Sequence, residues 1–397
     1  MTAIILDGHL SSALAAVRSL GQKGIPVICG ATRKTAMSLF SCWCGKSFIY
    51  TSPGQDKDKF ISDLLDVLKE SKEKMVVFSF SDETFLPISE EREKIQPYAE
   101  LILSSKESIE SAFNKEKTLR LAKENGITIP ETYMVSSGQE LEDLALKLNY
   151  PLIVKPRQSY VWKNGQGILG TTVYVNSPEE LKKEFKDLAS KMGQLPLIQD
   201  LIQGEEFGIF GLFEHGEPLA LFAHKRIRSI SPLGGASVLR ESIKMPPDMK
   251  EYSLKLLKAL QWQGPAMVEF KVDKKDKKPK LMEINGRFWG SLPLAIYAGL
   301  DFPYLYFQIA EGKNIGNNFE YKENIRSRHF LADFKNLISV LLDKGKIEGI
   351  GYPDKGETLA DFFKFFDEDL YYDVESLNDA KPFFMEIADS IARTINK

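Results

Sequence analysis

The chain has 397 residues, enough for two or three domains of roughly 100–200 residues each. Its 43% hydrophobic and 27% charged residues are typical of globular proteins and exclude a disordered, collagen-like or coiled-coil chain. With 52 basic and 55 acidic residues the net charge is −3, which argues against a nucleic-acid partner. No membrane-length apolar run or signal-peptide pattern occurs, and three cysteines are too few for a disulfide framework. We therefore expect a soluble cytoplasmic protein with no membrane partner and with reduced cysteines.

The first 110 residues predict a small doubly wound domain. Residues 3–6 and 25–29 are apolar strand-like runs on either side of a helical pattern, and residues 75–78 continue the sheet. No G-x-G-x-x-G follows the first strand, so a dinucleotide site is not favoured. Asp82 and Glu83 follow the strand near residue 78, at the edge where open α/β sheets bind ligands. Helix capping is the alternative explanation for these two acids.

The middle of the chain alternates strands and helices. A charged helix is expected over residues 114–126, and the strand at 150–156 carries Lys155 where a core strand would have an apolar residue. Residues 159–170, with three glycines, predict a hairpin with a flexible tip. Strands are expected over residues 206–243, followed by a helix at 248–260.

Residues 282–287, Met-Glu-Ile-Asn-Gly-Arg, carry the clearest chemical signal. Alternation along a strand places Glu283, Asn285 and Arg287 on one face, while the intervening apolar side chains face the core. A hairpin through the charged run 274–278 would bring Glu269 beside Glu283. Two carboxylates and an amide suit one or two Mg²⁺ ions that share phosphate ligands, and arginine suits phosphoryl or carboxylate oxygens.

In this order and spacing, these motifs resemble the ATP-grasp superfamily, in its carboxylate–amine ligase or carbamoyl-phosphate-synthase-like branch. The resemblance implies that Lys115 and Lys155 contact phosphates and that the loop with Gly165 and Gly167 folds over the triphosphate. It also implies an adenine hinge and a ribose contact, formed by Gln199, Asp200, Ile202 and Glu206. Glu269, Glu283 and Asn285 would be the metal ligands, and Arg287 would contact the triphosphate.

The implied fold class is α/β (α+β) with four parts. These are a Rossmann-like pre-ATP-grasp domain (1–113), a lid subdomain (114–200), a core with the metal site (201–312) and a helical, aromatic-rich C-terminal segment (313–397). The implied cofactors are ATP and Mg²⁺, with Mn²⁺ as a substitute. The implied reaction activates a carboxylate as an acyl phosphate and joins it to an amine, releasing ADP and phosphate.

The expected metal ligands Glu269, Glu283 and Asn285 are together called the metal edge. The carboxylate and amine substrates are expected between this metal edge and the strands of residues 222–243. Lys225, Arg226 and Arg240 are candidates to hold the acid or the transferred phosphoryl group, so Arg226 and Arg240 join Arg287 as candidate catalytic residues. A basic, exposed pair of strands is the alternative explanation. A bicarbonate-activating enzyme and a non-catalytic ATP-binding protein remain alternative functions. The C-terminal segment is expected to pack on the substrate cleft or to form a homodimer contact.

Overall fold

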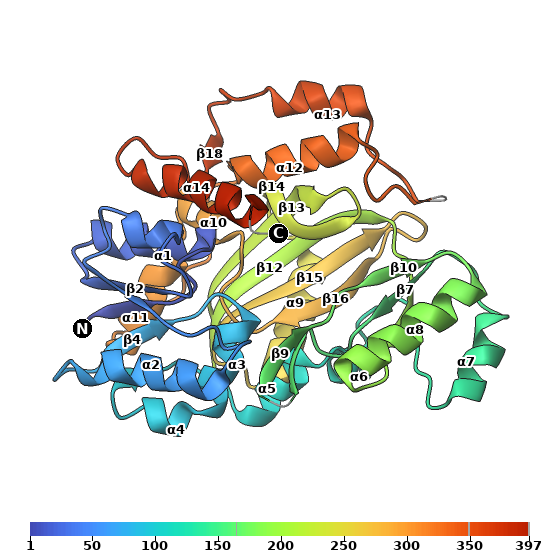
Figure 1. Ribbon diagram of the computed structural model, residues 1–397, viewed down its shortest axis with the longest axis horizontal. Coiled ribbons are helices and arrows are strands. Elements are labelled where there is room, and N and C mark those ends of the chain that lie inside the picture. Colours follow the sequence, from blue (N-terminus) through green and yellow to red (C-terminus); the bar gives the residue numbers. More distant parts are fainter. Residues whose placement is uncertain (164, 348–349, 396–397) are drawn as a thin grey trace.

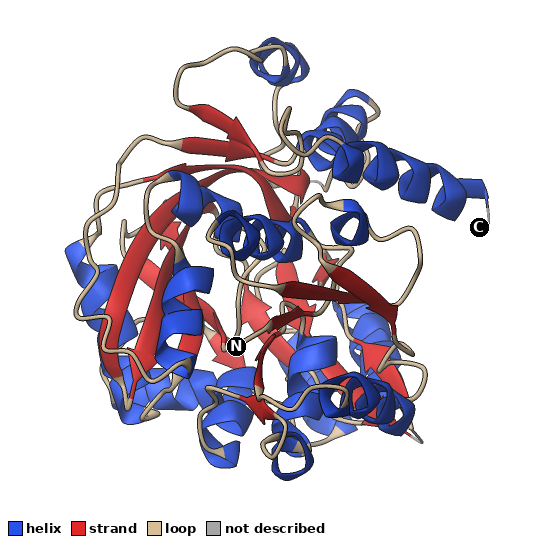
Figure 2. Ribbon diagram, turned by 90° about the vertical axis from the view of Figure 1, so that its left-hand side faces the viewer, coloured by secondary structure: helices blue, strands red, loops and turns tan. Residues whose placement is uncertain are grey.

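The computed structural model describes residues 1–163, 165–347 and 350–395 (Figure 1). It contains three main sheets and one separate hairpin. Figure 1 shows the N-terminal domain on the left and the lid subdomain on the right of the largest sheet. The side view of Figure 2 shows helices packed on the outer faces of these sheets. None of the helices in the described ranges is both long enough and apolar enough to cross a membrane.

The N-terminal domain is a five-stranded parallel sheet in the order β3-β2-β1-β4-β5, which confirms the doubly wound prediction. Its strands are β1 (Ala3–Ile5), β2 (Val27–Ala31), β3 (Lys46–Ile49), β4 (Met75–Phe78) and β5 (Ala99–Glu100). Its helices are α1 (Ser11–Gln22), η1 (Met37–Phe40), α2 (Lys57–Lys69), α3 (Asp82–Glu90), α4 (Arg92–Ile95) and α5 (Lys106–Phe113). Helix α1 is buried from Ser11 to Leu20 because it also packs against α10 and α11 of the core.

The region expected to form the lid subdomain contains a four-stranded antiparallel sheet, here called the lid sheet, in the order β10-β7-β11-β6. Its strands are β6 (Thr132–Tyr133), β7 (Leu152–Lys155), β10 (Val173–Val175) and β11 (Leu197–Asp200). Helices α7 (Gly138–Ala145) and α8 (Pro178–Met192) share an apolar cluster with this sheet, whereas α6 (Lys115–Glu124) packs against α5 and β16. The glycine-containing segment forms the separate hairpin, β8 (Tyr160–Lys163) and β9 (Gln166–Leu169).

The core is a seven-stranded sheet in the order β16-β15-β12-β13-β14-β17-β18. Its strands are β12 (Gly204–Glu214), β13 (Glu217–Ser231), β14 (Gly234–Ser242), β15 (Gly264–Asp273), β16 (Pro279–Asn285), β17 (Arg326–Arg328) and β18 (Leu370–Tyr372). The helices from here onward are α9 (Pro247–Ala259), α10 (Leu292–Tyr297), α11 (Phe302–Ala310), α12 (Phe330–Leu341), α13 (Lys355–Phe362) and α14 (Lys381–Ile395).

The C-terminal segment, expected to be helical and aromatic-rich, contains helices α12, α13 and α14 and also two short strands. Strands β17 and β18 extend the core sheet beyond β14, and α12 packs against β13. Helix α14 returns to the N-terminal domain, where it packs on η1. The buried Arg18 of α1 holds this end of the chain through Asp379, at 2.9 Å. The last part of the chain therefore joins the N-terminal domain to the core.

A single apolar cluster runs through the N-terminal domain and the core sheet. Phe78 and Phe80 at the end of β4 stack on Phe288, with ring centroids 5.8 and 5.5 Å apart. Trp289 continues the stack to Phe210 on β12, at 4.6 Å. This packing fixes the carboxyl edge of the parallel sheet against the chain that follows β16.

Candidate active site

Strands β15 and β16 form the hairpin that the sequence predicted. Glu269 lies opposite Glu283 in the register, and Met267 lies opposite Asn285. The Asn285 Nδ2 donates to Glu283 Oε1 at 3.2 Å. Both carboxylates are largely shielded from solvent, with side chains 16% and 31% exposed. The geometry thus brings the three proposed metal ligands together.

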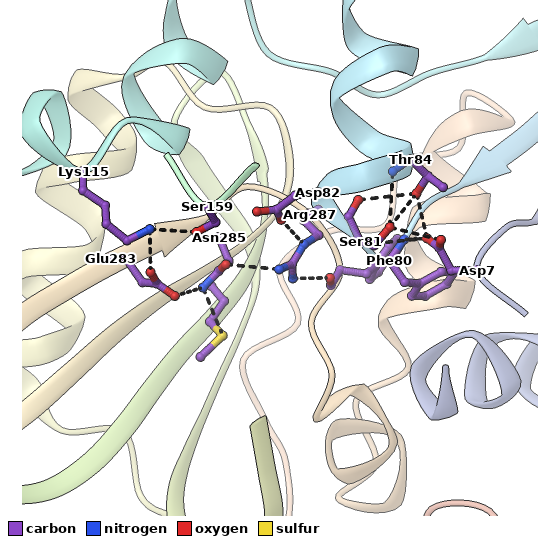
Figure 3. A network of polar contacts seen from close by, with 12 residues as sticks. Asp7, Phe80, Ser81, Asp82, Thr84, Lys115, Ser159, Glu283, Asn285 and Arg287 are labelled. Carbon is purple, nitrogen blue, oxygen red and sulfur yellow. Dashed lines mark hydrogen bonds and ion pairs between the residues drawn. The ribbon is translucent and has the colours of Figure 1, made fainter. Parts of the chain in front are cut away.

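A row of polar contacts leads from these ligands to both flanking domains (Figure 3). On one side, Lys115 Nζ lies 3.3 Å from Glu283 Oε2. On the other side, Arg287 donates to Asn285 Oδ1 at 3.2 Å and to Asp82 Oδ1 at 2.8 Å. The candidate site is therefore completed by a residue of the N-terminal domain, since Asp82 begins α3.

The start of α3 argues against helix capping as the role of the two acids that follow β4. Ser81, not Asp82 or Glu83, caps α3 by accepting from Thr84 N at 3.2 Å. Asp7 at the end of β1 accepts from the backbone N–H groups of Phe80 and Ser81 at 2.9 and 3.1 Å, which holds the start of α3 (Figure 3). Asp82 is then free to reach Arg287.

Two lysines place positive charge beside Glu283. Lys155, at the end of β7, is only 5% exposed, and Lys115 begins α6. Burial, reinforced by the nearby charge of Lys115, lowers the pKa of Lys155 to about 8. Burial alone would raise the pKa of Glu283, but Lys115 and Lys155 outweigh it and hold that pKa at about 2. Glu283 is therefore ionised at every physiological pH.

The donor set fits Mg²⁺ bound together with phosphate oxygens. Among the described residues, no three histidine, cysteine or carboxylate side chains are close enough to hold a metal by themselves. Magnesium commonly takes only one or two carboxylates and completes its octahedron with phosphate and water. Glu269, Glu283 and the Asn285 amide match that pattern, and the Lys115 ammonium beside Glu283 shows that this edge attracts a cation.

The proposed hinge joins the lid sheet to the core sheet. Gln199 is fully buried on β11, where its Nε2 donates to Thr132 at 2.8 Å and its Oε1 lacks a partner among the described residues. Asp200 ends that strand, and Ile202 is buried in the link to β12. Glu206, on β12, pairs with Lys271 at 2.7 Å and with Arg226. Both carboxylate oxygens of Glu206 thus already have cationic partners.

The glycine-containing hairpin lies against the N-terminal domain. The Gly167 N–H donates to Gly54 O at 2.8 Å, and Trp162 Nε1 donates to Pro53 O at 3.1 Å. At its base, Ser159 Oγ accepts from Lys115 Nζ at 2.8 Å (Figure 3). Gly165 has a φ of +77°, a conformation that favours glycine. The hairpin therefore connects a phosphate-binding candidate to the N-terminal domain.

The basic side chains of β13 and β14, Lys225, Arg226 and Arg240, form ion pairs with different acidic residues. Arg226 pairs with Glu206 and, at 3.4 Å, with Glu269, so it reaches the metal edge. Arg240 is 1% exposed and pairs with the equally buried Asp373. Arg240 is therefore not free to hold a substrate, because its charge is already paired. Arg226 and Arg240 are also shielded from solvent, so the two strands do not form the exposed basic pair given as the alternative. Lys225 turns instead to Glu205, at 2.5 Å.

A cavity of about 600 Å³ opens beside the metal edge. Its walls come from the N-terminal domain, the core and the C-terminal segment. Besides the metal ligands, Arg226, Arg240 and Arg287, it is lined by residues that the sequence analysis did not select, among them His9, Trp289, His329 and Glu386. His9, His329 and Glu386 are isolated in the sequence, and Trp289, two positions after Arg287, carries no pattern that marks it as a site residue.

Sequence comparison relates part of the chain to ATP-grasp proteins. Residues 194–331 match a family described as "ATP-grasp in the biosynthetic pathway with Ter operon". The carbamoyl phosphate synthase large chain of Thermotoga petrophila is 28% identical over 269 residues, or 64% of this chain. The match covers only 23% of that relative, so this chain corresponds to about a quarter of its length.

Solved structures extend the similarity to most of the fold. An N5-carboxyaminoimidazole synthetase from Staphylococcus aureus aligns with a TM-score of 0.64 at 14% identity, covering 87% of this chain and 86% of the other. An L-amino acid ligase from Bacillus licheniformis aligns with a TM-score of 0.59 at 19% identity, covering 78% and 74%. These matches confirm the resemblance drawn from the sequence: residues 194–331 match an ATP-grasp family, and the fold of most of the chain is similar to that of solved ATP-grasp proteins.

Proposed function

We propose that this protein is an ATP-dependent ligase that converts a carboxylic acid to an acyl phosphate and then joins it to an amine. The observation that carries the proposal is the row Lys115–Glu283–Asn285–Arg287, with Glu269 and Lys155 beside it. The row combines two metal-binding carboxylates with three cations in a shielded place. Phosphoryl transfer requires this combination and no protein nucleophile.

In this proposal each residue has a defined task. Lys115 and Lys155 hold the phosphates, while Glu269, Glu283 and Asn285 hold Mg²⁺, which neutralises phosphate charge when bound. Gln199, Asp200 and Ile202 line the adenine, and Glu206 lies toward the ribose. The hairpin with Gly165 and Gly167 covers the phosphates and excludes water, which protects an acyl phosphate from hydrolysis.

Arg287 and Arg226 stand on the cavity side of the metal edge. There they can hold the acid substrate and the transferred phosphoryl group by charge-assisted hydrogen bonds. Arg240 acts differently from the sequence expectation, since its charge is already paired with Asp373. We infer that it shapes the cavity wall instead of holding the acid.

The size of the cavity favours an organic acid over bicarbonate. Bicarbonate needs only a small anion site, whereas about 600 Å³ is within the range of small-molecule binding sites. The cavity also continues from the metal edge to the C-terminal helices, leaving space for a second substrate. Bicarbonate activation is therefore the less favoured function, and a screen for ADP release distinguishes it from the ligase.

The test is a screen for ADP release with Mg·ATP and pools of carboxylic acids and amines, with bicarbonate as a separate arm. We expect an acid pool to stimulate ADP release and an amine to give an amide product. Glu283→Gln should abolish this release. Glu217→Gln, the same change at an exposed position on β13, should leave it intact. Stimulation by bicarbonate alone, or full activity of folded Glu283→Gln, would refute the proposal.

A further inference from the structure

The C-terminal segment contributes a histidine–carboxylate pair to the lining of this cavity. His329 precedes α12 and Glu386 lies on α14, and both side chains line the same cavity as Glu269 and Arg287. His329 Nε2 lies 2.6 Å from Glu386 Oε1. None of the tasks assigned above to nucleotide, metal or acid uses this pair.

The hydrogen bond to Glu386 defines what the imidazole can do. With Nε2–H donated to the carboxylate, the neutral ring keeps its lone pair on Nδ1. The imidazole is 22% exposed, so it is shielded but accessible. Glu386 Oε2 is buried and lacks a hydrogen-bond partner within the described ranges, so this carboxylate is not saturated by the protein.

The surrounding charges favour a basic histidine. Burial alone lowers the pKa of His329, but the hydrogen bond and charge of Glu386, helped by Asp373, outweigh burial, and the net shift is upward. Arg240, on β14, opposes that rise. Glu375 also lies near, and burial, with the neighbouring charge of Glu386, raises its own pKa to about 7.

We propose that His329, oriented by Glu386, is the general base that takes the proton from the amine substrate. The assignment rests on the proposed function. The amine nitrogen attacks the acyl phosphate carbon, a C–N bond forms, and the C–O bond to phosphate breaks so that phosphate leaves with its electron pair. The bound ammonium first gives one proton to His329 Nδ1, which frees the nitrogen lone pair for the attack, and His329 then passes that proton to solvent. The second proton that the nitrogen loses as the amide forms leaves with the phosphate. His329 is thus a catalytic residue and Glu386 a positioning residue.

The chemistry of the second step requires such a group. Most aliphatic amines are protonated near neutral pH, and an ammonium ion has no lone pair with which to attack. The residues at the metal edge are unsuited to accept this proton, because in the proposed function the carboxylates there hold Mg²⁺ and the cations hold phosphate. A base elsewhere in the lining of the same cavity leaves the metal edge to the acid and its phosphate.

Hydroxylamine separates this assignment from a structural role of the pair. It is largely unprotonated at neutral pH, so it traps an acyl phosphate as a hydroxamate without needing a base. The experiment supplies Mg·ATP, a pool of amino acids as acids and amines, and either no addition or hydroxylamine. Amide and hydroxamate are measured for the wild type, His329→Gln, Glu386→Gln and the exposed control Glu368→Gln.

We expect His329→Gln to lower the amide rate by about 100-fold or more while hydroxamate formation stays within about twofold. Glu386→Gln should lower the amide rate less and move the acid limb of its pH profile to lower pH, because the charge that raises the pKa of His329 is lost. Glu386→Asp should restore the limb.

An unchanged amide rate in His329→Gln would overturn the assignment, as would an equal loss of amide and hydroxamate in a variant that melts like the wild type. An unmoved acid limb in Glu386→Gln would also overturn it. If the wild type forms no hydroxamate with any acid, the proposed ligase function itself fails, and the role of His329 fails with it.

Discussion

Replacing Lys155 by methionine tests whether the buried charge of this lysine lowers the free energy of unfolding of the nucleotide-free protein. The lysine is 5% exposed, and burial holds its pKa at about 8 in place of the usual 10.5. Each pKa unit corresponds to about 1.4 kcal/mol, so keeping this side chain charged in the fold costs roughly 3 kcal/mol. Without nucleotide, the Lys155→Met variant should therefore be the more stable protein at pH 7, by up to that amount.

The dependence on pH has a definite sign. Between pH 8 and 10.5 the unfolded chain keeps a proton on Lys155 that the folded chain releases, so the stability of the wild type rises with pH in this window. The advantage of Lys155→Met should thus be complete below pH 8 and disappear near pH 10.5. Urea unfolding followed by tryptophan fluorescence at several pH values measures the difference.

The matched control is Lys163→Met, on the exposed end of β8, which should change the unfolding free energy little at any pH. Added Mg·ATP should stabilise the wild type by mass action but not Lys155→Met. A Lys155→Met variant that is no more stable than the wild type at pH 7, or whose advantage is independent of pH, would refute the reasoning.

Two further predictions concern contacts between domains. Trp162→Phe removes the donor to Pro53 O and should weaken hairpin docking by about 1 kcal/mol. We expect faster proteolysis of the hairpin in the variant. We also expect more ADP released per amide formed, because the acyl phosphate is less well protected from water. If neither value changes, this contact does not hold the hairpin in place. Arg18→Met leaves Asp379, whose side chain is 3% exposed, without its cation and should lower the unfolding free energy by about 3–5 kcal/mol. Lys23→Met, which breaks the more exposed pair with Asp301, is the control and should cost about 1 kcal/mol or less. Equal losses in urea unfolding would count against the importance of burial.

The parts of the site that the sequence predicted are those set by local geometry. Alternation along a strand places Glu283 and Asn285 on one face, and a short hairpin is enough to bring Glu269 opposite. Lys155 was recognisable because a charged residue ends an otherwise apolar strand. The doubly wound domain followed from strand and helix periods in the same way.

The ion pairs that the sequence analysis missed join distant segments of the chain. Asp82 and Arg287 are 205 positions apart, and Arg240 and Asp373 are 133 apart, so no spacing rule connects them. Strand β17 is only three residues long and reads Arg-Ser-Arg, a sequence that does not suggest a buried strand. Its burial follows from pairing with β14 and β18, which only the fold reveals.

The ion pair between Lys115 and Glu283 has a consequence for how nucleotide and metal bind. If Lys115 binds a phosphate, its ion pair with Glu283 weakens. In the same way, if Glu283 binds a metal ion, its ion pair with Lys115 weakens. Nucleotide alone would draw Lys115 away and leave Glu283 and Glu269 facing each other. Nucleotide with metal satisfies all three side chains, so each should strengthen binding of the other.

Glu283→Gln should therefore reverse the usual effect of removing a metal ligand. In EDTA, the variant should bind ADP more tightly than the wild type, by up to about tenfold, because Lys115 no longer gives up a charge-assisted hydrogen bond and no carboxylate repels the phosphates. Added Mg²⁺ should strengthen ADP binding to the wild type and hardly change it in the variant. Calorimetric titration of ADP with and without Mg²⁺, with Glu217→Gln as the matched control, measures both effects. If Glu283→Gln binds metal-free ADP no better than the wild type, or gains as much from Mg²⁺, then Glu283 does not link the two ligands through Lys115.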